Sequence, residues 1–268
     1  MDLHLQDKRA LVTGSTAGIG FATALGLARE GAKVFVNGRM RGRAEQAATR
    51  IREQVPGAQV TAVAADLSGA EGCAALVGAV PELDVLVNNV GIFEPKPFEE
   101  IDDSDWLRFF ETNVMSGVRL SRHYLKGMRQ RDWGRIVFVS SESGVQIPAE
   151  MIHYGMTKTA QLAIARGIAE TTAGTGITVN SVLPGPTRSE GVGTFVDQMA
   201  RQRGVAFEAM EEAMEKEFFE TARPTSLLKR FATVEEVASM ILYVCSAAAS
   251  ATNGAALRVD GGVVRAIP

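Results

Sequence analysis

Tyr154 and Lys158 are spaced so that they could transfer a proton together. The apolar pattern over 153–173 predicts a helix, and residues four apart share one helix face. The phenol and the ammonium would then point at one site. Because a nearby positive charge favours the phenolate, it lowers the tyrosine pKa from its usual value of about 10. Tyr-x-x-x-Lys is common by chance, so an unrelated surface pair is the alternative.

A serine pair precedes this tyrosine. Ser140 and Ser141 follow the apolar run 136–139, which predicts a buried strand. Thirteen residues separate Ser141 from Tyr154. Side chains at the carboxyl ends of parallel strands meet the crevice where ligands bind. Ser141 could therefore hydrogen-bond a substrate oxygen and hold it in line with Tyr154.

A glycine-rich turn, from Thr13 to Gly20, follows the first predicted strand and precedes a segment with helical spacing. Glycines at such a turn permit a tight bend, a close approach of backbone to a pyrophosphate, and close packing of helix on sheet. The helix N-terminus then offers free N–H groups to the phosphates. The spacing differs from the common G-x-G-x-x-G pattern, so a plain turn is the alternative. We predict dinucleotide contacts at Gly14, Ser15, Thr16, Gly18, Ile19 and Gly20.

The segment after the second predicted strand indicates which dinucleotide binds. A NAD-binding sheet usually has Asp or Glu there to hold the ribose 2′-OH. Residues 37–43 contain no acid and three arginines, Arg39, Arg41 and Arg43. Arginine is unfavourable at a helix start, whereas a 2′-phosphate is a good partner for it. We predict NADP(H) as the preferred cofactor, gripped by Arg39, with NAD(H) as the second choice; a solvated basic helix start is the alternative for Arg41 and Arg43.

These groups need a scaffold in which several strands end at one edge. Short apolar runs, several of them rich in β-branched residues, alternate with helical patterns along the whole chain. The predicted strands are 10–12, 34–36, 60–64, 85–87, 136–139, 177–179 and 256–259, and the predicted helices are 18–30, 41–54, 103–130, 153–173 and 233–246. Fully buried strands and right-handed crossovers predict an α/β fold, a doubly wound (Rossmann) parallel sheet of about seven strands with helices on both faces.

One segment breaks this alternation. The chain is predicted to be a single dinucleotide-binding and catalytic domain over 1–268, but 186–228 is long for a loop in a compact domain. Within it, glutamates interleave with Phe207, Met210 and Phe218 at helical spacing, which predicts an amphipathic helix rather than a metal site. This variable segment could form a lid on the substrate, or equally could pack on the body or on a neighbouring subunit.

The composition argues against several classes of binding partner. The formal net charge of −3 over 268 residues argues against nucleic acid. Cys73 and Cys245 are the only cysteines, and the three histidines have no ligand spacing, so no metal site and no disulfide framework is predicted. The N-terminus has no signal-peptide pattern, and no run reaches the roughly 18 apolar residues of a membrane span. We therefore expect a cytoplasmic protein with no membrane partner.

Taken together and in order, these motifs resemble those of the short-chain dehydrogenase/reductase family over nearly the whole chain. They look closest to the NADPH-dependent 3-oxoacyl-carrier-protein reductase-like members. The matching residues are 13–20, Asp66 and Leu67, 88–91, Asn113, Ser141, Tyr154 with Lys158, Pro184 and Gly185, and 260–262.

The resemblance implies an activity and the residues that perform it. Hydride would pass between NADP(H) and a carbonyl or alcohol, with Tyr154 as the acid in reduction and the base in oxidation. Ser141 would position the carbonyl, and Lys158 would tune Tyr154 and bind the nicotinamide ribose. Asn113 would kink its helix and hold a water that links Lys158 to solvent.

The resemblance also implies the remaining cofactor contacts and the assembly. The residues are Asp66 and Leu67 at the adenine, Asn89 at the ribose, Thr187 and Ser189 at the carboxamide, and Gly91, Pro184 and Gly185 along the cleft. Members usually form tetramers or dimers, so we expect a homo-oligomer built through the helices 103–130 and 153–173. Val90 departs from the usual alanine and adds bulk near the cofactor. Thr187 and Ser189 also depart from the residues frequent at their positions.

The substrate is left open by the sequence. A largely apolar small molecule is favoured by residues expected around the pocket, namely Phe93, Gln146, Ile147, Met151, Phe195 and Met199. His153 is expected at the pocket rim or surface rather than as a proton donor. The main rival function is a catalytically idle NADP-binding sensor or scaffold, although such proteins tend to lose the tyrosine or the lysine. A hydrolase using Ser141 is rejected, because there is no G-x-S-x-G elbow and His153 is too close in sequence.

Overall fold

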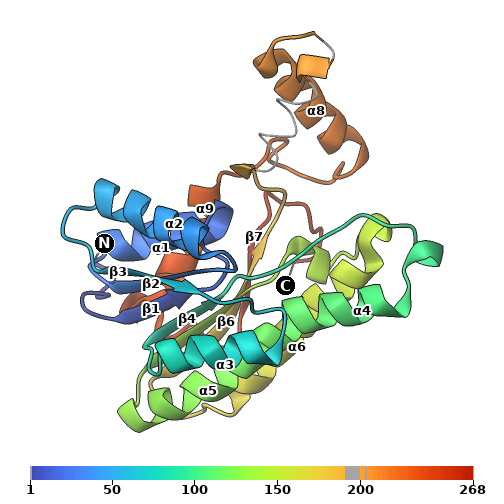
Figure 1. Ribbon diagram of the computed structural model, residues 1–268. Coiled ribbons are helices and arrows are strands. Elements are labelled where there is room, and N and C mark those ends of the chain that lie inside the picture. The colour runs from blue at the N-terminus through green and yellow to red at the C-terminus, as the bar shows by residue number, and fades with distance from the viewer. Residues whose placement is uncertain (1, 191–199, 203, 268) are drawn as a thin grey trace.

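The computed structural model describes residues 2–190, 200–202 and 204–267 (Figure 1). Its centre is a seven-stranded parallel sheet with the strand order β3-β2-β1-β4-β5-β6-β7. The strands are β1 (Arg9–Val12), β2 (Lys33–Gly38), β3 (Val60–Ala64), β4 (Val85–Asn88), β5 (Gly134–Val139), β6 (Ile177–Pro184) and β7 (Ala256–Val259). The predicted doubly wound parallel sheet is confirmed.

Helices cover both faces of this sheet (Figure 1). One face carries α1 (Gly18–Arg29), α2 (Arg41–Gln54) and α9 (Val234–Cys245), and the other carries α3 (Ala70–Ala79), α5 (Ser116–Arg131) and α6 (Ile152–Glu170). Each face has its own apolar core. Burial on both faces requires continuous apolar strands, and every residue of β5 and β6 is buried. Short 3-10 turns occur at η1 (Phe98–Glu100), η3 (Glu142–Gly144), η4 (Ala149–Met151) and η5 (Ala247–Ala249).

The strand order creates the crevice that the site needs. From β1 the sheet continues through β2 and β3 on one side, and from β4 through β7 on the other. The loops after β1 and β4 therefore diverge, which is where open α/β sheets bind ligands. Residues 13–20 follow β1, residues 89–91 follow β4, and Ser141 follows β5.

The helix predicted over 103–130 contains an irregular turn. Between α4 (Asp103–Phe110) and α5, residues Glu111–Met115 form the π-helical turn η2. Such turns are rare and are frequent at functional sites. Asn113 lies in this turn and is buried. Its Oδ1 accepts a hydrogen bond from the Ile92 N–H at 2.8 Å, and its Nδ2 donates to the Ile92 carbonyl at 3.0 Å, which fastens the loop after β4 to the turn.

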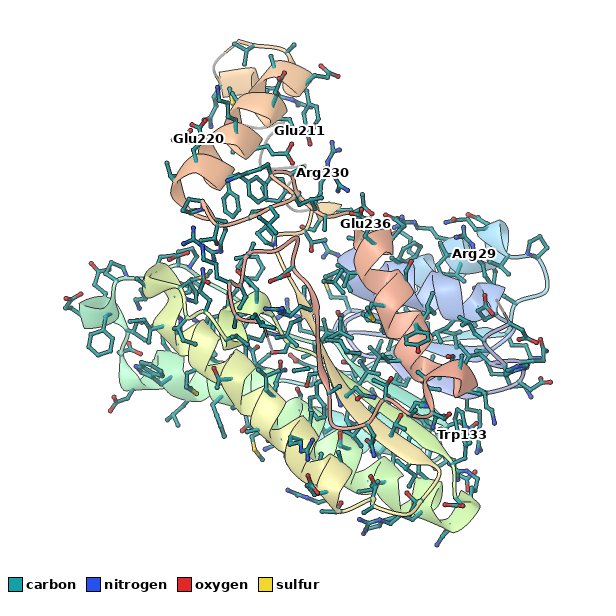
Figure 2. The ribbon with its side chains drawn as sticks, turned by 180° about the vertical axis from the view of Figure 1, so that it is seen from behind. Arg29, Trp133, Glu211, Glu220, Arg230 and Glu236 are labelled. Atoms are coloured by element: carbon teal, nitrogen blue, oxygen red, sulfur yellow. The ribbon has the colours of Figure 1, made fainter. Side chains whose placement is uncertain are left out.

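The helix α8 (Phe207–Thr221) lies apart from the two cores (Figure 1), as the labelled Glu211 and Glu220 show from the other side (Figure 2). Met210 packs with Ala200 in a small cluster of its own. At the end of α8, Phe218, Phe219 and Phe231 pack with ring centroids 5.1 to 5.2 Å apart. The amphipathic helix predicted in the variable segment is thus confirmed. Within the described residues, no helix combines the length and apolar character needed to cross a bilayer.

Candidate active site

The glycine-rich turn after β1 leaves backbone open to a ligand. Gly18 has a φ of +59°, and a Cβ there would meet nothing within 4 Å. At Gly20, by contrast, a Cβ would lie 2.6 Å from both Asn89 Nδ2 and the Gly14 carbonyl oxygen, so only glycine fits. The Asn89 amide donates to the carbonyl oxygens of Thr13 at 2.9 Å and Gly14 at 3.1 Å. The turn is therefore held from behind while its outer backbone faces the cleft.

Asn37 is a supporting residue that the sequence reasoning missed. It is buried near the end of β2, where its Oδ1 accepts from the Gly14 N–H at 3.2 Å and its Nδ2 donates to the carbonyls of Val63 and Ala65. The Ser15 hydroxyl accepts from the Asn37 N–H at 3.0 Å and donates back to the end of β1. The Ser15 side chain is thus occupied inside the protein, and its N–H donates to the Asn37 carbonyl at 2.9 Å, so neither is free to bind a ligand. An asparagine inside an apolar strand was the available signal.

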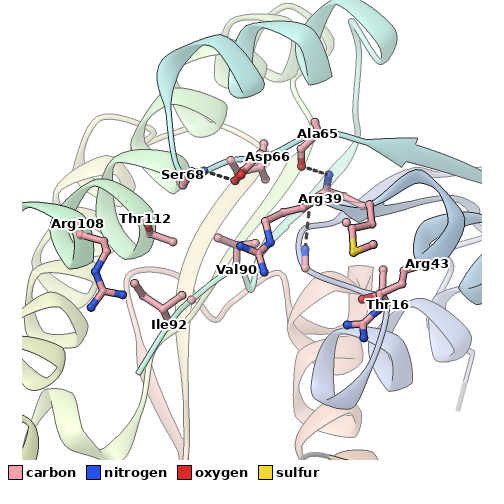
Figure 3. Close-up of a pocket in the computed structure, with 16 residues that line it drawn as sticks. Thr16, Arg39, Arg43, Ala65, Asp66, Ser68, Val90, Ile92, Arg108 and Thr112 are labelled. Atoms are coloured by element: carbon pink, nitrogen blue, oxygen red, sulfur yellow. Dashed lines mark hydrogen bonds between the residues drawn. The ribbon is translucent and has the colours of Figure 1, made fainter. Parts of the chain in front are cut away.

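A cavity of about 420 Å³ opens beside this turn (Figure 3). Its lining includes the predicted residues Gly14, Thr16, Arg39, Asp66, Leu67 and Gly91, together with Val90 and Arg43. Figure 3 shows the Arg39 side chain extending over this cavity. Neither Arg39 nor Arg43 has an ion-pair partner in the part of the chain that the structure describes. The cavity therefore offers two uncompensated guanidinium groups to an anion.

The groups predicted to do chemistry meet in a second cavity of about 230 Å³. Ser141 reaches it from the end of β5, and Tyr154 and Lys158 reach it from the first turns of α6. Lys158 Nζ lies 5.5 Å from the centre of the Tyr154 ring. Predicted cofactor residues share the lining, namely Ile19, Asn89, Gly91, Pro184, Gly185 and Thr187. The structure therefore brings the phenol, the ammonium and the serine hydroxyl together beside the glycine-rich turn.

Burial sets the protonation of this cluster. It raises the pKa of Tyr154 to about 12, an effect that the contact with Ser141 and the charge of Arg223 reduce and the charge of Glu142 increases. Burial also lowers the pKa of Lys158 to about 8, against the opposing effect of Glu142. Without a further positive charge nearby, the phenol is protonated at neutral pH.

Lys158 is held by neutral acceptors. Its ammonium donates to the Val139 carbonyl at 2.9 Å and to Gln161 Oε1 at 3.3 Å. The Gln161 amide nitrogen in turn donates to the main-chain carbonyl of Asn113 at 2.6 Å. Gln161 was not singled out from the sequence, since a glutamine one turn after the lysine carries no distinctive signal by itself.

Glu142 and Arg223 form a buried ion pair beside Ser141. Glu142 Oε1 accepts from Arg223 Nε at 2.9 Å, while its Oε2 accepts from the Ser143 N–H at 2.7 Å and from the Ser141 hydroxyl. Arg223 also donates to Glu150 at 3.1 Å. The pair links the chain after α8 to Ser141. It joins residues 81 positions apart, so no local pattern could have predicted it.

A third cavity, of about 860 Å³, adjoins the catalytic groups. Phe93 and Met151, both predicted around the substrate, line it together with Ser189, Phe218, Arg223 and Phe231. Gln146 and Ile147 are exposed and do not line the cavity, because the chain after η3 turns them outward. Phe195 and Met199 lie outside the described residues.

His153 was expected at the pocket rim or surface, but in the structure it is fully buried. Its ring packs 4.0 Å from the Phe109 ring, measured between centroids, and neither nitrogen has a hydrogen-bond partner in the described part of the chain. Burial lowers its pKa, which favours the neutral ring. The helical turn of α6 that points Tyr154 at the cleft points its neighbour into the interface with α4.

Comparison with known proteins decides the family. The short chain dehydrogenase profile matches residues 8–200. The chain belongs to the short-chain dehydrogenase/reductase family. It is 46% identical over 267 residues to the "Uncharacterized oxidoreductase YvaG" of Bacillus subtilis, covering 100% of both chains. It is 30% identical over 267 residues to the 3-oxoacyl-[acyl-carrier-protein] reductase FabG of Aquifex aeolicus, covering 98% of this chain and 100% of that one.

A solved structure extends this likeness. The L-sorbose reductase of Gluconobacter frateurii, complexed with NADPH and L-sorbose, superposes with a TM-score of 0.91 at 31% identity, covering 100% of both chains. The resemblance inferred from the motifs, including that to ketoacyl reductases, is confirmed. As a short-chain dehydrogenase/reductase, the protein is an oxidoreductase of hydroxyl and carbonyl groups. The open backbone at Gly18 fits a phosphorylated dinucleotide, and so does Arg39, which lines the first cavity with Gly14 and Thr16 and has no ion-pair partner among the described residues.

Proposed function

We propose that the protein interconverts a carbonyl and an alcohol using NADP(H), with Tyr154 as the proton donor and acceptor. The observation that carries this proposal is the shared cavity of Ser141, Tyr154 and Lys158, which is continuous in its lining with Asn89 and Gly91 beside the glycine-rich turn. A phenol, an ammonium and a hydroxyl gathered at the nucleotide end of a doubly wound sheet suit proton transfer coupled to a redox step.

The chain's own residues handle the proton. When bound, NADPH supplies a hydride from its nicotinamide C4 to the carbonyl carbon. Tyr154 Oη gives its proton to the carbonyl oxygen, and the Lys158 ammonium stabilises the phenolate that results. The Ser141 hydroxyl, which donates to Glu142 in this structure, turns its proton to the carbonyl oxygen and holds that oxygen in line with the phenol. In oxidation the same atoms act in reverse, so Tyr154 accepts the alcohol proton. Asn113 supports Lys158 through its main-chain carbonyl and Gln161.

The cofactor preference rests on charge. We assign the 2′-phosphate of NADP(H) to Arg39, with Arg43 beside it, because both guanidinium groups border the first cavity without a protein partner among the described residues. Asp66 lies across the same cavity and accepts a hydrogen bond from the Ser68 N–H at 3.1 Å. Asp66 and Leu67 are assigned to the adenine, Asn89 to the ribose, and Thr187 and Ser189 to the carboxamide.

The substrate assignment is a small carbonyl compound or alcohol with an apolar body. Phe93, Phe218 and Phe231 supply aromatic surface around the cavity of about 860 Å³, and Glu142 with Arg223 supplies one polar corner next to Ser141. The segment 186–228 would act as a lid, since part of it lines the cavity. The homo-oligomer and the cytoplasmic location stay predictions from the sequence.

A catalytically idle NADP-binding sensor or scaffold is the alternative. It is disfavoured because a sensor has no use for a phenol and an ammonium facing one cavity. A panel of ketones, ketoses, β-keto thioesters and secondary alcohols, followed at the NADPH absorbance with both cofactors, tests the proposal. Turnover with NADPH favoured over NADH is expected. Tight NADPH binding with no turnover on any substrate would establish the sensor instead.

A further inference from the structure

Gln161 bridges Lys158 and the π turn at Asn113. Its side chain spans the gap between them, with Oε1 3.3 Å from Lys158 Nζ and Nε2 2.6 Å from the Asn113 carbonyl oxygen. Gln161 is 1% exposed, so its amide is shielded from bulk solvent.

The orientation of this amide is determined by its partners. The Lys158 ammonium has only hydrogens to donate, so the group facing it must be Oε1. The Asn113 carbonyl can only accept, so the group facing it must be Nε2. Both partners are satisfied in one orientation, and reversing the amide would break both bonds.

The donors of Lys158 can then be assigned. An ammonium has three N–H groups. One points to the Val139 carbonyl at 2.9 Å and one to Gln161, which leaves the third for the cavity that Lys158 shares with Tyr154. The two acceptors are held on rigid elements, the end of a strand and, through Gln161, the π turn. They therefore fix the direction of the third N–H group.

We propose that Gln161 is a positioning residue that ties the Lys158 ammonium to the π turn at Asn113. This inference rests on the proposed function, in which Lys158 assists Tyr154. A primary amide has no proton that titrates near neutral pH, so Gln161 holds the ammonium rather than relaying protons. The protonation of Lys158 therefore depends on this amide and on the charges around it.

Few charges act on Lys158 in the described residues. From η3, the Glu142 carboxylate favours the ammonium, and Tyr154 lies one turn earlier on the same helix. Arg223, from the chain after α8, pairs with Glu142. The groups that reach it from β5 and from the π turn are neutral, the carbonyl of Val139 and, through Gln161, that of Asn113. A carboxylate at position 161 would thus be a new charge in direct contact with Lys158.

The test compares Gln161→Glu and Gln161→Leu with the control Gln146→Glu, which places the same charge on an exposed position near the site. In Gln161→Glu the added carboxylate favours the ammonium and disfavours the phenolate, so both pKa values rise. The midpoint of the kcat/KM profile should move about 1 to 3 pH units to the alkaline side. Gln161→Leu should lower kcat about tenfold or more, with the change in KM for NADPH smaller. Unmoved midpoints in Gln161→Glu, or a shift that Gln146→Glu reproduces, would overturn the inference.

A second readout separates this inference from the proposed function. NADP⁺ affinity, measured by calorimetry across pH, should fall as Lys158 loses its proton, and Gln161→Glu should move that fall to higher pH. An inactive wild type with this shift present would reject the function and keep the link. A wild type that turns over without the shift would reject the link alone. Thermal melting identifies a variant that fails to fold, and Gln161→Asn, which keeps the amide but is too short to span both partners, then supplies the test through the same loss of kcat.

Discussion

The two ends of the cleft differ in how the chain holds them. At the cofactor end, Asn37 and Asn89 hold the glycine-rich turn through buried hydrogen bonds to neighbouring strand ends. At the substrate end, the described part of α8 packs in a small apolar cluster of its own and on Phe231, and the chain after it reaches the body through the ion pair of Arg223 with Glu142. Backbone that is bonded on all sides is pre-organised, whereas a segment held by a few ion pairs can be exchanged without disturbing the core. This contrast would let the substrate end vary while the cofactor end stays fixed.

The catalytic phenol lies between the two ends and should show the largest effect. Tyr154→Phe removes the proton that is proposed to pass to the carbonyl oxygen, so turnover should fall by about 10²- to 10⁴-fold. NADPH affinity, measured by fluorescence titration, should stay close to that of the wild type. A variant with near-normal turnover would show that another group transfers the proton, and the role proposed for Tyr154 would be wrong.

Arg39→Asp tests the cofactor end. It exchanges the guanidinium assigned to the 2′-phosphate for a carboxylate that repels it and suits a ribose 2′-OH. The ratio of kcat/KM for NADPH to that for NADH should fall by about ten- to a hundredfold, the loss of one charge-assisted hydrogen bond. Arg41→Asp is the matched control, because Arg41 is exposed and pairs with Glu45 at 3.8 Å. If both substitutions lowered this ratio equally, the cofactor preference would depend on the overall positive charge of the region and not on Arg39 in particular.

Two substitutions at the substrate end should shift the pH dependence of kcat/KM in opposite directions. Glu142 raises the pKa of Tyr154 and Arg223 lowers it. In oxidation the base is the phenolate, so the rate rises as pH passes the pKa of Tyr154. Glu142→Gln should therefore move the rise of kcat/KM to lower pH, and Arg223→Met should move it to higher pH, each by about one unit.

These profiles need the same substrate and saturating cofactor to be comparable. Shifts in one common direction would show that the pair acts by packing and not by charge. Loss of activity without any shift would point to a role of Arg223 in closing the segment over the substrate.

What the sequence could predict was carried by local patterns, and what it could not predict depends on contacts between distant residues. All seven strands were predicted, because buried strands read as continuous apolar runs, and the glycine turn, Tyr154 and Lys158 were found from local spacing. The helix α3 was missed, since its Ala-Gly-rich sequence has little apolar periodicity. Gln161, Glu142 and Arg223 act through partners far along the chain, so their roles appear only once the fold brings those partners together.

Arg188→Gln should change stability and activity the least, and it tests directly whether α8 is loosely attached to the body. Arg188 pairs with Glu211 of α8 at 2.5 Å, but half of its side chain is exposed. An exposed ion pair contributes about 0.2 to 1 kcal/mol, so the melting temperature should change by only a few degrees. Because one such pair is among several ties of α8, kcat/KM should change less than about threefold. A larger loss, comparable with that of Arg223→Met, would mean that α8 is held as rigidly as the glycine turn, and the proposed division of the cleft into a fixed and an exchangeable end would be wrong.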